Sequence, residues 1–283
     1  EAKECMAAWW EGEYNERPVI GYSIAKPGIT HIPTCDHWFL GDYKNLDKME
    51  ELVEAYRANA SCYNYKCELI PRLNINYGPG IMACVLGCKY QFARKGGHGT
   101  VWFVDHGNPE ELIDRLESVP MNDNNKWYKR ILTVTEIAAK KSEGDFSVGI
   151  TDLGGIMDII ASFLSFKDLI LTMTRKPEII DTARAIVMEK WHKMYNAITN
   201  ILHKYNLGTT GWLNVWSPKD YYPIQSDICA ALNPKLFKRF ILPDLKEQCD
   251  RLDHVIYHWD GPKQLKFADD ILSIPNLQGI QWV

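Results

Sequence analysis

The sequence lacks several features that would place it in a broad class at once. None of its apolar runs reaches the roughly 18 residues expected of a membrane-spanning helix. No charged and then apolar leader of the secretory kind opens the chain. The formal net charge is −4, whereas a nucleic-acid-binding protein usually carries a basic, clustered charge. We therefore expect a cytoplasmic protein that binds neither a membrane nor nucleic acid.

The positions of the cysteines and glycines argue against a disulfide framework, a structural zinc site and a nucleotide-binding loop. The eight cysteines form no repeating framework, so reduced thiols are expected. Cys62 with Cys67 and Cys84 with Cys88 have short spacings that zinc ligands also show, but neither pair has a second one beside it. Buried small apolar side chains are the simpler interpretation. The stretch KGGHG is not followed by a helix pattern and does not match a dinucleotide- or phosphate-binding loop.

What is present is a globular composition with alternating patterns. The chain has 283 residues, 46% of them hydrophobic and 24% charged, enough for one sizeable core. Strand and helix patterns alternate without a linker, which predicts a single α/β domain over residues 1–283, with an N-terminal helical segment over 1–16. An open doubly wound sheet is the alternative to a (β/α)8 barrel of the TIM type.

Polar side chains at the ends of predicted strands favour the barrel. Because side chains alternate along a strand, three segments each carry polar or aromatic groups on one face. The three sets are Arg72, Asn74 and Asn76, then Trp212, Asn214 and Trp216, and finally His258 with Asp260. A fourth segment, FSVGITDLGG, ends in Asp152. Barrel enzymes build their sites at the carboxyl ends of their strands. The chain stops on a predicted strand over 277–283, so its last βα unit or units are expected to be missing from this chain.

One stretch carries a resemblance to a known family. SDICAALNP, from Ser226 to Pro234, is followed by Leu-Phe at 236–237, Phe240 and Pro243. This resembles the Asp-Ser/small-x-Ser-Pro-x-x-Phe-x-x-Phe-x-x-Pro pattern of the uroporphyrinogen decarboxylase superfamily, which also contains cobalamin-dependent methyltransferases. HVIYHWDG and GIQWV occupy the places of the next two barrel strands. The resemblance implies a (β/α)8 barrel, commonly a homodimer, whose funnel opens at the strand carboxyl ends.

Departures from the family pattern separate its two branches. The decarboxylase binds the carboxylates of its substrate through an arginine-bearing loop after the first strand, and needs no cofactor. Here that place reads SIAKPGIT, with Lys26 as its only cation, which argues against a polyanionic substrate. The methyltransferase branch typically binds zinc through His-x-Cys and a later Cys. In this chain His258-Trp-Asp260 keeps the histidine and replaces the first cysteine with a carboxylate, which zinc also accepts. The later cysteine would lie beyond Val283.

The leading hypothesis is therefore a methyltransferase that moves a methyl group from a small, partly aromatic donor to a corrinoid carrier protein. His258 and Asp260 are predicted to bind zinc or to act as acid and base, with Asp152 and Asp227 as further catalytic residues. The predicted substrate-binding residues are His37, Asn76, Tyr77, Trp212, Asn214, Trp216, Tyr222 and Gln281.

Structural roles are the competing interpretation for several of these residues. Asp227 can cap the helix that begins near Pro234, Asn214 can bond to the backbone, and the tryptophans can belong to the core. The alternative functions are a decarboxylase acting on a carboxylate and a non-catalytic barrel that binds a small ligand.

Overall fold

The computed structural model describes residues 1–14, 16–29, 31–32, 48–95 and 98–283. Contacts divide the chain into two compact units, each made of three segments. The first unit contains Glu1–Tyr77, Ile131–Thr151 and Ala197–Tyr222. The second contains Gly78–Arg130, Asp152–Asn196 and Pro223–Val283. Three elements have residues in both units: α5 (Lys126–Ser142), α8 (Pro177–Lys204) and β9 (Tyr221–Gln225).

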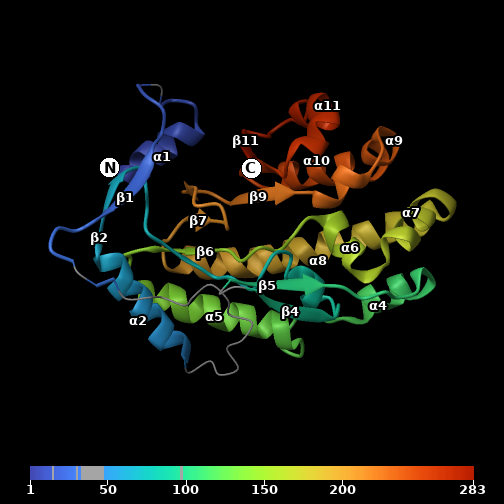
Figure 1. The fold of residues 1–283 in the computed structure, drawn as a ribbon, viewed down its shortest axis with the longest axis horizontal. Helices are drawn as coiled ribbons and strands as arrows, with labels where there is room; N and C mark the ends of the chain where they lie inside the picture. Colours follow the sequence, from blue (N-terminus) through green and yellow to red (C-terminus); the bar gives the residue numbers. More distant parts are fainter. Residues whose placement is uncertain (15, 30, 33–47, 96–97) are drawn as a thin grey trace. The chain divides into compact units, whose positions relative to one another are not determined.

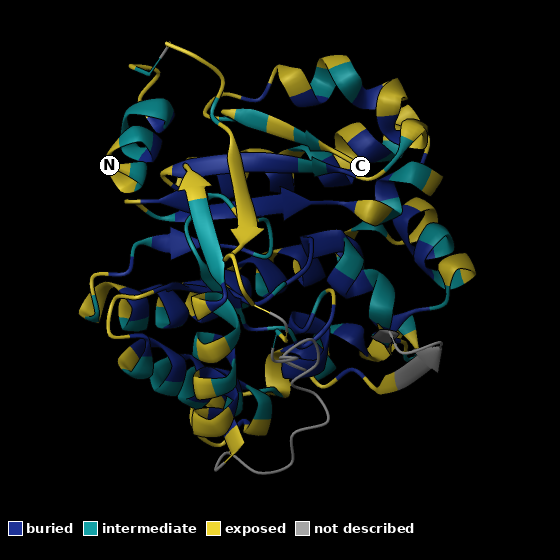
Figure 2. Ribbon diagram, turned by 60° about the vertical axis from the view of Figure 1, so that its left-hand side comes forward, coloured by how far each residue is buried: buried dark blue, intermediate teal, exposed yellow. Residues whose placement is uncertain are grey.

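The first unit contains short strands with two helices of its own. Its elements are α1 (Ala2–Trp10), β1 (Gly21–Ala25), α2 (Lys48–Ser61), β2 (Tyr63–Cys67), β3 (Arg72–Asn74), β6 (Ser147–Gly149), β7 (Thr209–Thr210) and β8 (Trp216–Ser217). β1 pairs with β2 and β7 with β8, both antiparallel, while β3 and β6 are parallel. β1 is exposed along its whole length, as Figure 2 shows.

The second unit contains a hairpin, a parallel strand pair and most of the helices. It contains α3 (Met82–Val85), β4 (Tyr90–Lys95), β5 (His98–Phe103), η2 (Pro109–Glu111), α4 (Leu112–Ser118), α6 (Ile156–Phe163), α7 (Phe166–Arg175), η3 (Asp227–Ala231), α9 (Pro234–Leu236), η4 (Phe237–Ile241), α10 (Leu242–Arg251), β10 (His254–Trp259), η5 (Pro262–Phe267), α11 (Ala268–Leu272) and β11 (Gly279–Trp282). β4 and β5 lie side by side as an antiparallel pair (Figure 1). β10 and β11 are parallel.

Several local features follow from sequence patterns. The spacing of apolar residues after Pro177 is typical of an amphipathic helix, and in α8 this stripe is buried at Ile180, Ala183, Val187, Trp191, Met194, Tyr195, Ile198 and Leu202. The Asn108 side chain accepts a hydrogen bond of 3.1 Å from the Glu110 amide, and Pro109 follows it at the first helical position. The predicted N-terminal helix is α1. These features depend on neighbours in the sequence, which is why the pattern alone predicts them.

The predicted (β/α)8 barrel is wrong. The described strands form one three-stranded sheet, in the order β11-β10-β9, and four two-stranded sheets, and none of these sheets closes on itself. A TIM-type barrel needs eight parallel strands that each pair on both sides. Here three of the two-stranded sheets are antiparallel. The alternation of strands and helices along the sequence does not determine which strands pair, and this explains the error.

The predicted strand around Asn214 is also wrong. Residues 211–215 connect β7 to β8 in an antiparallel pair and belong to neither strand. Trp216 lies in β8 and is buried, with its indole N–H donating to the Leu207 carbonyl at 2.7 Å. The carbonyl of Trp216 accepts a bond of 2.9 Å from the Trp10 indole. Trp216 therefore holds α1 and the segment before β7 together within the first unit.

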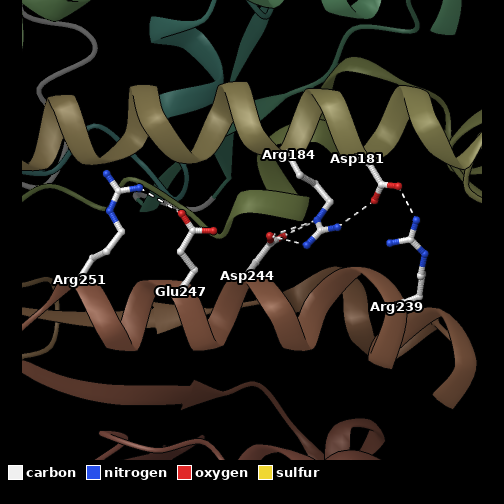
Figure 3. Close-up of polar contacts among 6 residues, drawn as sticks. All are labelled: Asp181, Arg184, Arg239, Asp244, Glu247 and Arg251. Carbon is white, nitrogen blue, oxygen red and sulfur yellow. Dashed lines mark hydrogen bonds and ion pairs between the residues drawn. The ribbon is translucent and has the colours of Figure 1, made fainter.

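Ion pairs join α8 and α10 in the second unit (Figure 3). The guanidinium of Arg184 binds both carboxylate oxygens of Asp244, with its Nε at 2.9 Å from Oδ2 and 3.1 Å from Oδ1 and its Nη2 at 2.7 Å from Oδ1. Asp181 bridges Arg184 to Arg239 of η4, and Arg251 contacts Glu247 at 3.1 Å within α10. Only the central pair is buried, so it carries most of the electrostatic effect.

Two further findings concern the cysteine thiols and the composition of the helices. The cysteines that the structure describes, at positions 5, 62, 67, 84, 88, 229 and 249, are all free. Burial raises the pKa of Cys84, Cys88, Cys229 and Cys249 to about 12, as expected for thiols that pack as small apolar groups. None of the described helices combines the length and the apolar composition that crossing a membrane requires.

Candidate functional site

The parallel pair of β10 and β11 brings two predicted site residues together. His258 and Gln281 are opposite each other in the register of these strands, near their carboxyl ends. The ring Nδ1 of His258 is hydrogen-bonded to Oε1 of Gln281. An amide oxygen only accepts, so His258 donates its Nδ1 proton. Gln281 is oriented in turn because its own Nε2 donates to the Trp282 carbonyl at 3.2 Å. In the neutral ring the lone pair therefore lies on Nε2.

A second carboxylate, which the sequence did not single out, joins Asp227. Asp158 lies in the first turn of α6 and is half-buried. Its Oδ2 accepts the backbone N–H of Asp227 at 3.0 Å, and its Oδ1 accepts that of Ile228 at 2.7 Å. These bonds attach α6 to the start of η3. They also place the two acidic residues against each other.

The two carboxyl groups have different electrostatic surroundings. Burial raises the pKa of Asp158 to about 7, and the charge of Asp227 adds to this shift, while the two backbone N–H donors oppose it. Asp227 is accessible to solvent, yet the protein atoms around its carboxyl group raise its pKa. The charge of His258 acts in the opposite direction and favours ionised Asp227. The carboxyl group of Asp158 is therefore partly protonated near neutral pH.

A pocket of about 370 Å³ adjoins this pair. Both aspartates line it, and Lys263 is a cation in its wall. The remaining lining is largely apolar: Phe103, Ala161, Ser162, Phe166, Ile228, Ala230 and Ala231. Mostly apolar walls with a few placed polar groups are typical of small-molecule sites. The pocket can therefore hold a small aromatic or aliphatic ligand against the carboxyl groups of Asp158 and Asp227.

Asp152 supports this site from the loop before α6. Its Oδ1 accepts the Gly154 amide at 2.8 Å, and its carbonyl accepts the Ile81 amide at 2.9 Å. Gly154 has a φ of +82°, and a Cβ there would lie 2.8 Å from the Cα of Gly80. The predicted catalytic role of Asp152 stays a prediction, and the observed contacts fix the loop that leads to Asp158.

Gly155 provides a test of how tightly this loop is packed. A Cβ at Gly155 would collide with the Gln225 carbonyl oxygen and with Oδ2 of Asp158. We expect Gly155→Ala to lower the free energy of unfolding by about 2 kcal/mol, as overpacking does. Thermal or urea unfolding measures the loss. Gly279→Ala is the control, because its Cβ would meet the Ile256 side chain at an ordinary 3.4 Å. Equal losses in the two variants would contradict the predicted clash.

The other predicted site residues lie in different parts of the chain. Asp260 directly follows β10, is exposed, and acts electrostatically on Asp227. Six predicted residues belong to the first unit: Asn76, Tyr77, Trp212, Asn214, Trp216 and Tyr222. Tyr77 and Tyr222 are buried and Asn214 is exposed. His37 lies outside the described residues. Asp227 does not cap the helix at Pro234; the side chain of Asn233 does, accepting the Leu236 amide at 3.0 Å.

The fit of a zinc ion can be judged from the donor groups. His258 and Asp260 are neighbours of Asp227, but in the described part of the chain no three His, Cys, Asp or Glu side chains are grouped as a metal site requires. This also applies to the two cysteine pairs. Zinc binding by His258 and Asp260 stays a prediction, and no chemical step is assigned to a metal below.

Asp158 is a candidate site residue that the sequence pattern does not single out. It lies within an otherwise apolar helical stretch, IMDIIASFLSF. The available signal was a single acid in the first turn of an otherwise apolar helix, directly after the glycine pair that ends FSVGITDLGG. An acidic residue in the first turn of a helix is common because it interacts favourably with the helix dipole. Only its contacts with η3 distinguish Asp158 from such a residue.

Comparison with known proteins shows a similarity of fold. No protein-family model matches the sequence, and no curated protein matches it. A solved structure of a methyltransferase from Methanosarcina mazei is similar to this chain, with a TM-score of 0.65 and 16% sequence identity. The similarity covers 99% of this chain and 75% of that one. It shows that the two chains share a fold.

Proposed function

We propose that this protein is a methyltransferase that removes a methyl group from a small aromatic methyl ether and passes it to a corrinoid on a carrier protein. The observation that carries the proposal is the Asp158–Asp227 pair beside a largely apolar pocket, where burial raises the pKa of Asp158 to about 7. The fold similarity to a methyltransferase supports the reaction class.

The chemistry of the pair suits a donor whose leaving group needs a proton. When the bond between methyl carbon and ether oxygen breaks, both bonding electrons stay on the oxygen. A reduced corrinoid on the carrier protein would supply the electron pair that bonds the methyl group. The oxygen then takes the proton from Asp158, which leaves a neutral alcohol or phenol and an Asp158 carboxylate. A carboxylic acid with a pKa near 7 is matched to this task at neutral pH.

The surrounding residues have supporting roles in this scheme. Ionised Asp227 raises the proton affinity of Asp158. His258, oriented by Gln281, acts electrostatically on Asp227. Phe103 and Phe166 provide apolar walls for the aromatic ring of the donor. The backbone donors from η3 hold the Asp158 carboxyl group in place as it gains and loses its proton.

A direct assay tests the proposal. The protein is incubated with anisole and a free reduced corrinoid in place of the carrier protein, and phenol is measured. We expect phenol to form with the wild-type protein and to form at least about tenfold more slowly with His258→Ala, because the variant loses the electrostatic interaction by which His258 favours ionised Asp227. Lys235→Ala, an exposed change at a residue that does not line the pocket, serves as the control. Absence of demethylation across a panel of methyl ethers, with tight binding of the same compounds, would favour a non-catalytic binding protein. Release of carbon dioxide from a porphyrinogen carboxylate would favour the decarboxylase.

A further inference from the structure

Arg72 occupies an unusual position in the first unit. It begins β3, which pairs in parallel with β6 so that Arg72 is opposite Ser147 and Asn74 is opposite Gly149. Arg72 and Asn74 lie on the same face because side chains alternate along a strand. A Cβ at Gly149 would lie 3.3 Å from the Cδ of Arg72 and 3.5 Å from the Gly211 carbonyl oxygen. The glycine therefore leaves the space across which the arginine side chain extends.

The guanidinium of Arg72 is largely removed from solvent and faces no carboxylate among the described residues. Burial lowers the pKa of Arg72 to about 10, so the group stays charged at neutral pH. Its Nη1 donates to the Gly211 carbonyl. Within the described part of the chain, the titratable side chains acting on it are Tyr56 and Tyr221, and no carboxylate pairs with it. A buried charge without a counter-ion is costly, which separates Arg72 from the paired Arg184.

Further polar atoms near the ends of the same two strands lack partners. Nε of Arg72, Oδ1 of Asn74 and the hydroxyl of Thr151 are buried and make no hydrogen bond to any described residue. Asn74 ends β3, and Thr151 comes two residues after the end of β6. Because β3 and β6 are parallel, these ends lie at the same edge of the pair. Native proteins leave few buried polar groups unpaired, and such groups often mark a site for a ligand.

We propose that Arg72 binds the carboxylate of a small organic monoanion at the carboxyl end of the β3–β6 pair. Nη1 is engaged by Gly211, so the edge of the guanidinium formed by Nε and Nη2 is the one that matches the two oxygens of a carboxylate. The Asn74 amide and the Thr151 hydroxyl provide additional neutral hydrogen-bonding groups. One guanidinium balances one negative charge, so a monocarboxylate is favoured over a phosphate or a polyanion. The site lies in the first unit and is independent of the proposed methyl transfer.

Benzoate and its neutral isostere benzamide test this assignment. Thermal unfolding of the full chain is followed as each compound is added at constant ionic strength, set with sodium chloride. We expect benzoate to raise the unfolding temperature with a saturating dose dependence and benzamide to have no effect, because ligands that bind only the folded state stabilise it. In Arg72→Met the dissociation constant for benzoate is expected to rise at least about tenfold. Arg57→Met, which removes an arginine that pairs with Asp145 in the same unit, is expected to keep the benzoate response.

Three results would overturn the assignment. They are no response to benzoate in the wild-type protein, an equal response to benzamide, and an undiminished benzoate response in Arg72→Met. If Arg72→Met does not fold, Arg72→Lys replaces it. That variant keeps the positive charge but loses the planar guanidinium, which can bond both carboxylate oxygens at once. We therefore expect about tenfold weaker benzoate binding. Unchanged binding in Arg72→Lys would likewise contradict a paired contact with the guanidinium edge.

Discussion

Replacing Asp158 with asparagine is expected to lower kcat/KM for demethylation of anisole by a factor of about 100 or more. Asparagine is similar in size, and its carbonyl oxygen can still accept the Ile228 amide, but it has no proton to give to the ether oxygen. The wild-type rate should fall as pH rises above about 7, because Asp158 then loses the proton that the leaving group requires. Asp158→Asn should lack this decline.

A change of donor separates a general acid from a structural residue. 4-Nitroanisole releases a more acidic phenol, which leaves without a proton. The deficit of Asp158→Asn should therefore shrink with this donor if Asp158 supplies the proton, and should stay constant if the variant merely distorts the pocket. Asp269→Asn, an exposed change in α11, is the control and should leave both rates unchanged. A deficit of equal size with both donors would contradict the proposed role.

Removing Arg184 is expected to have the largest effect on stability. Arg184→Met leaves the carboxylate of Asp244 buried without its bidentate ion pair. The free energy of unfolding at pH 8 should therefore fall by about 3 kcal/mol. Burial raises the pKa of Asp244 to about 6 even though Arg184 lowers it, so without Arg184 the pKa rises further. The carboxyl group of the variant then takes a proton as pH falls through this range, and the loss at pH 5 should be smaller than at pH 8. Urea unfolding at the two pH values measures both quantities.

Two further variants show whether the unpaired charge of Asp244 causes that loss of stability. Arg239→Met removes an ion pair whose arginine side chain is 52% exposed, and the expected loss is under about 1 kcal/mol. In the double variant Arg184→Met with Asp244→Leu, both charges are gone and most of the stability should return. A loss in Arg184→Met that is the same at pH 5 and pH 8 would show that lost packing, rather than the unpaired carboxylate, dominates.

Sequence patterns determined the features that depend on near neighbours. The apolar stripe of α8, the Asn108 cap, the strand that carries His258 and the final strand with Gln281 all follow from residues a few positions apart. Period-two alternation placed His258 and Asp260 on one face, and in the structure His258 lies in β10 while Asp260 directly follows it. What it could not supply was the partner, since the register that places Gln281 opposite His258 joins segments 23 residues apart.

Tertiary structure decided the rest, because strand pairing and burial depend on contacts between distant segments. The barrel prediction failed at this step: the strand of Asn74, the strand of His258 and the final strand were located approximately, but the sheets that the strands form are small and mostly antiparallel. Asp158 became a candidate acid only through the backbone of η3, about 70 residues later in the chain. The charge of Arg72 was evident from the sequence by itself. That it is buried without a counter-ion among the described residues is a property of the fold, because desolvation is set by everything that packs around a group and not by the group alone.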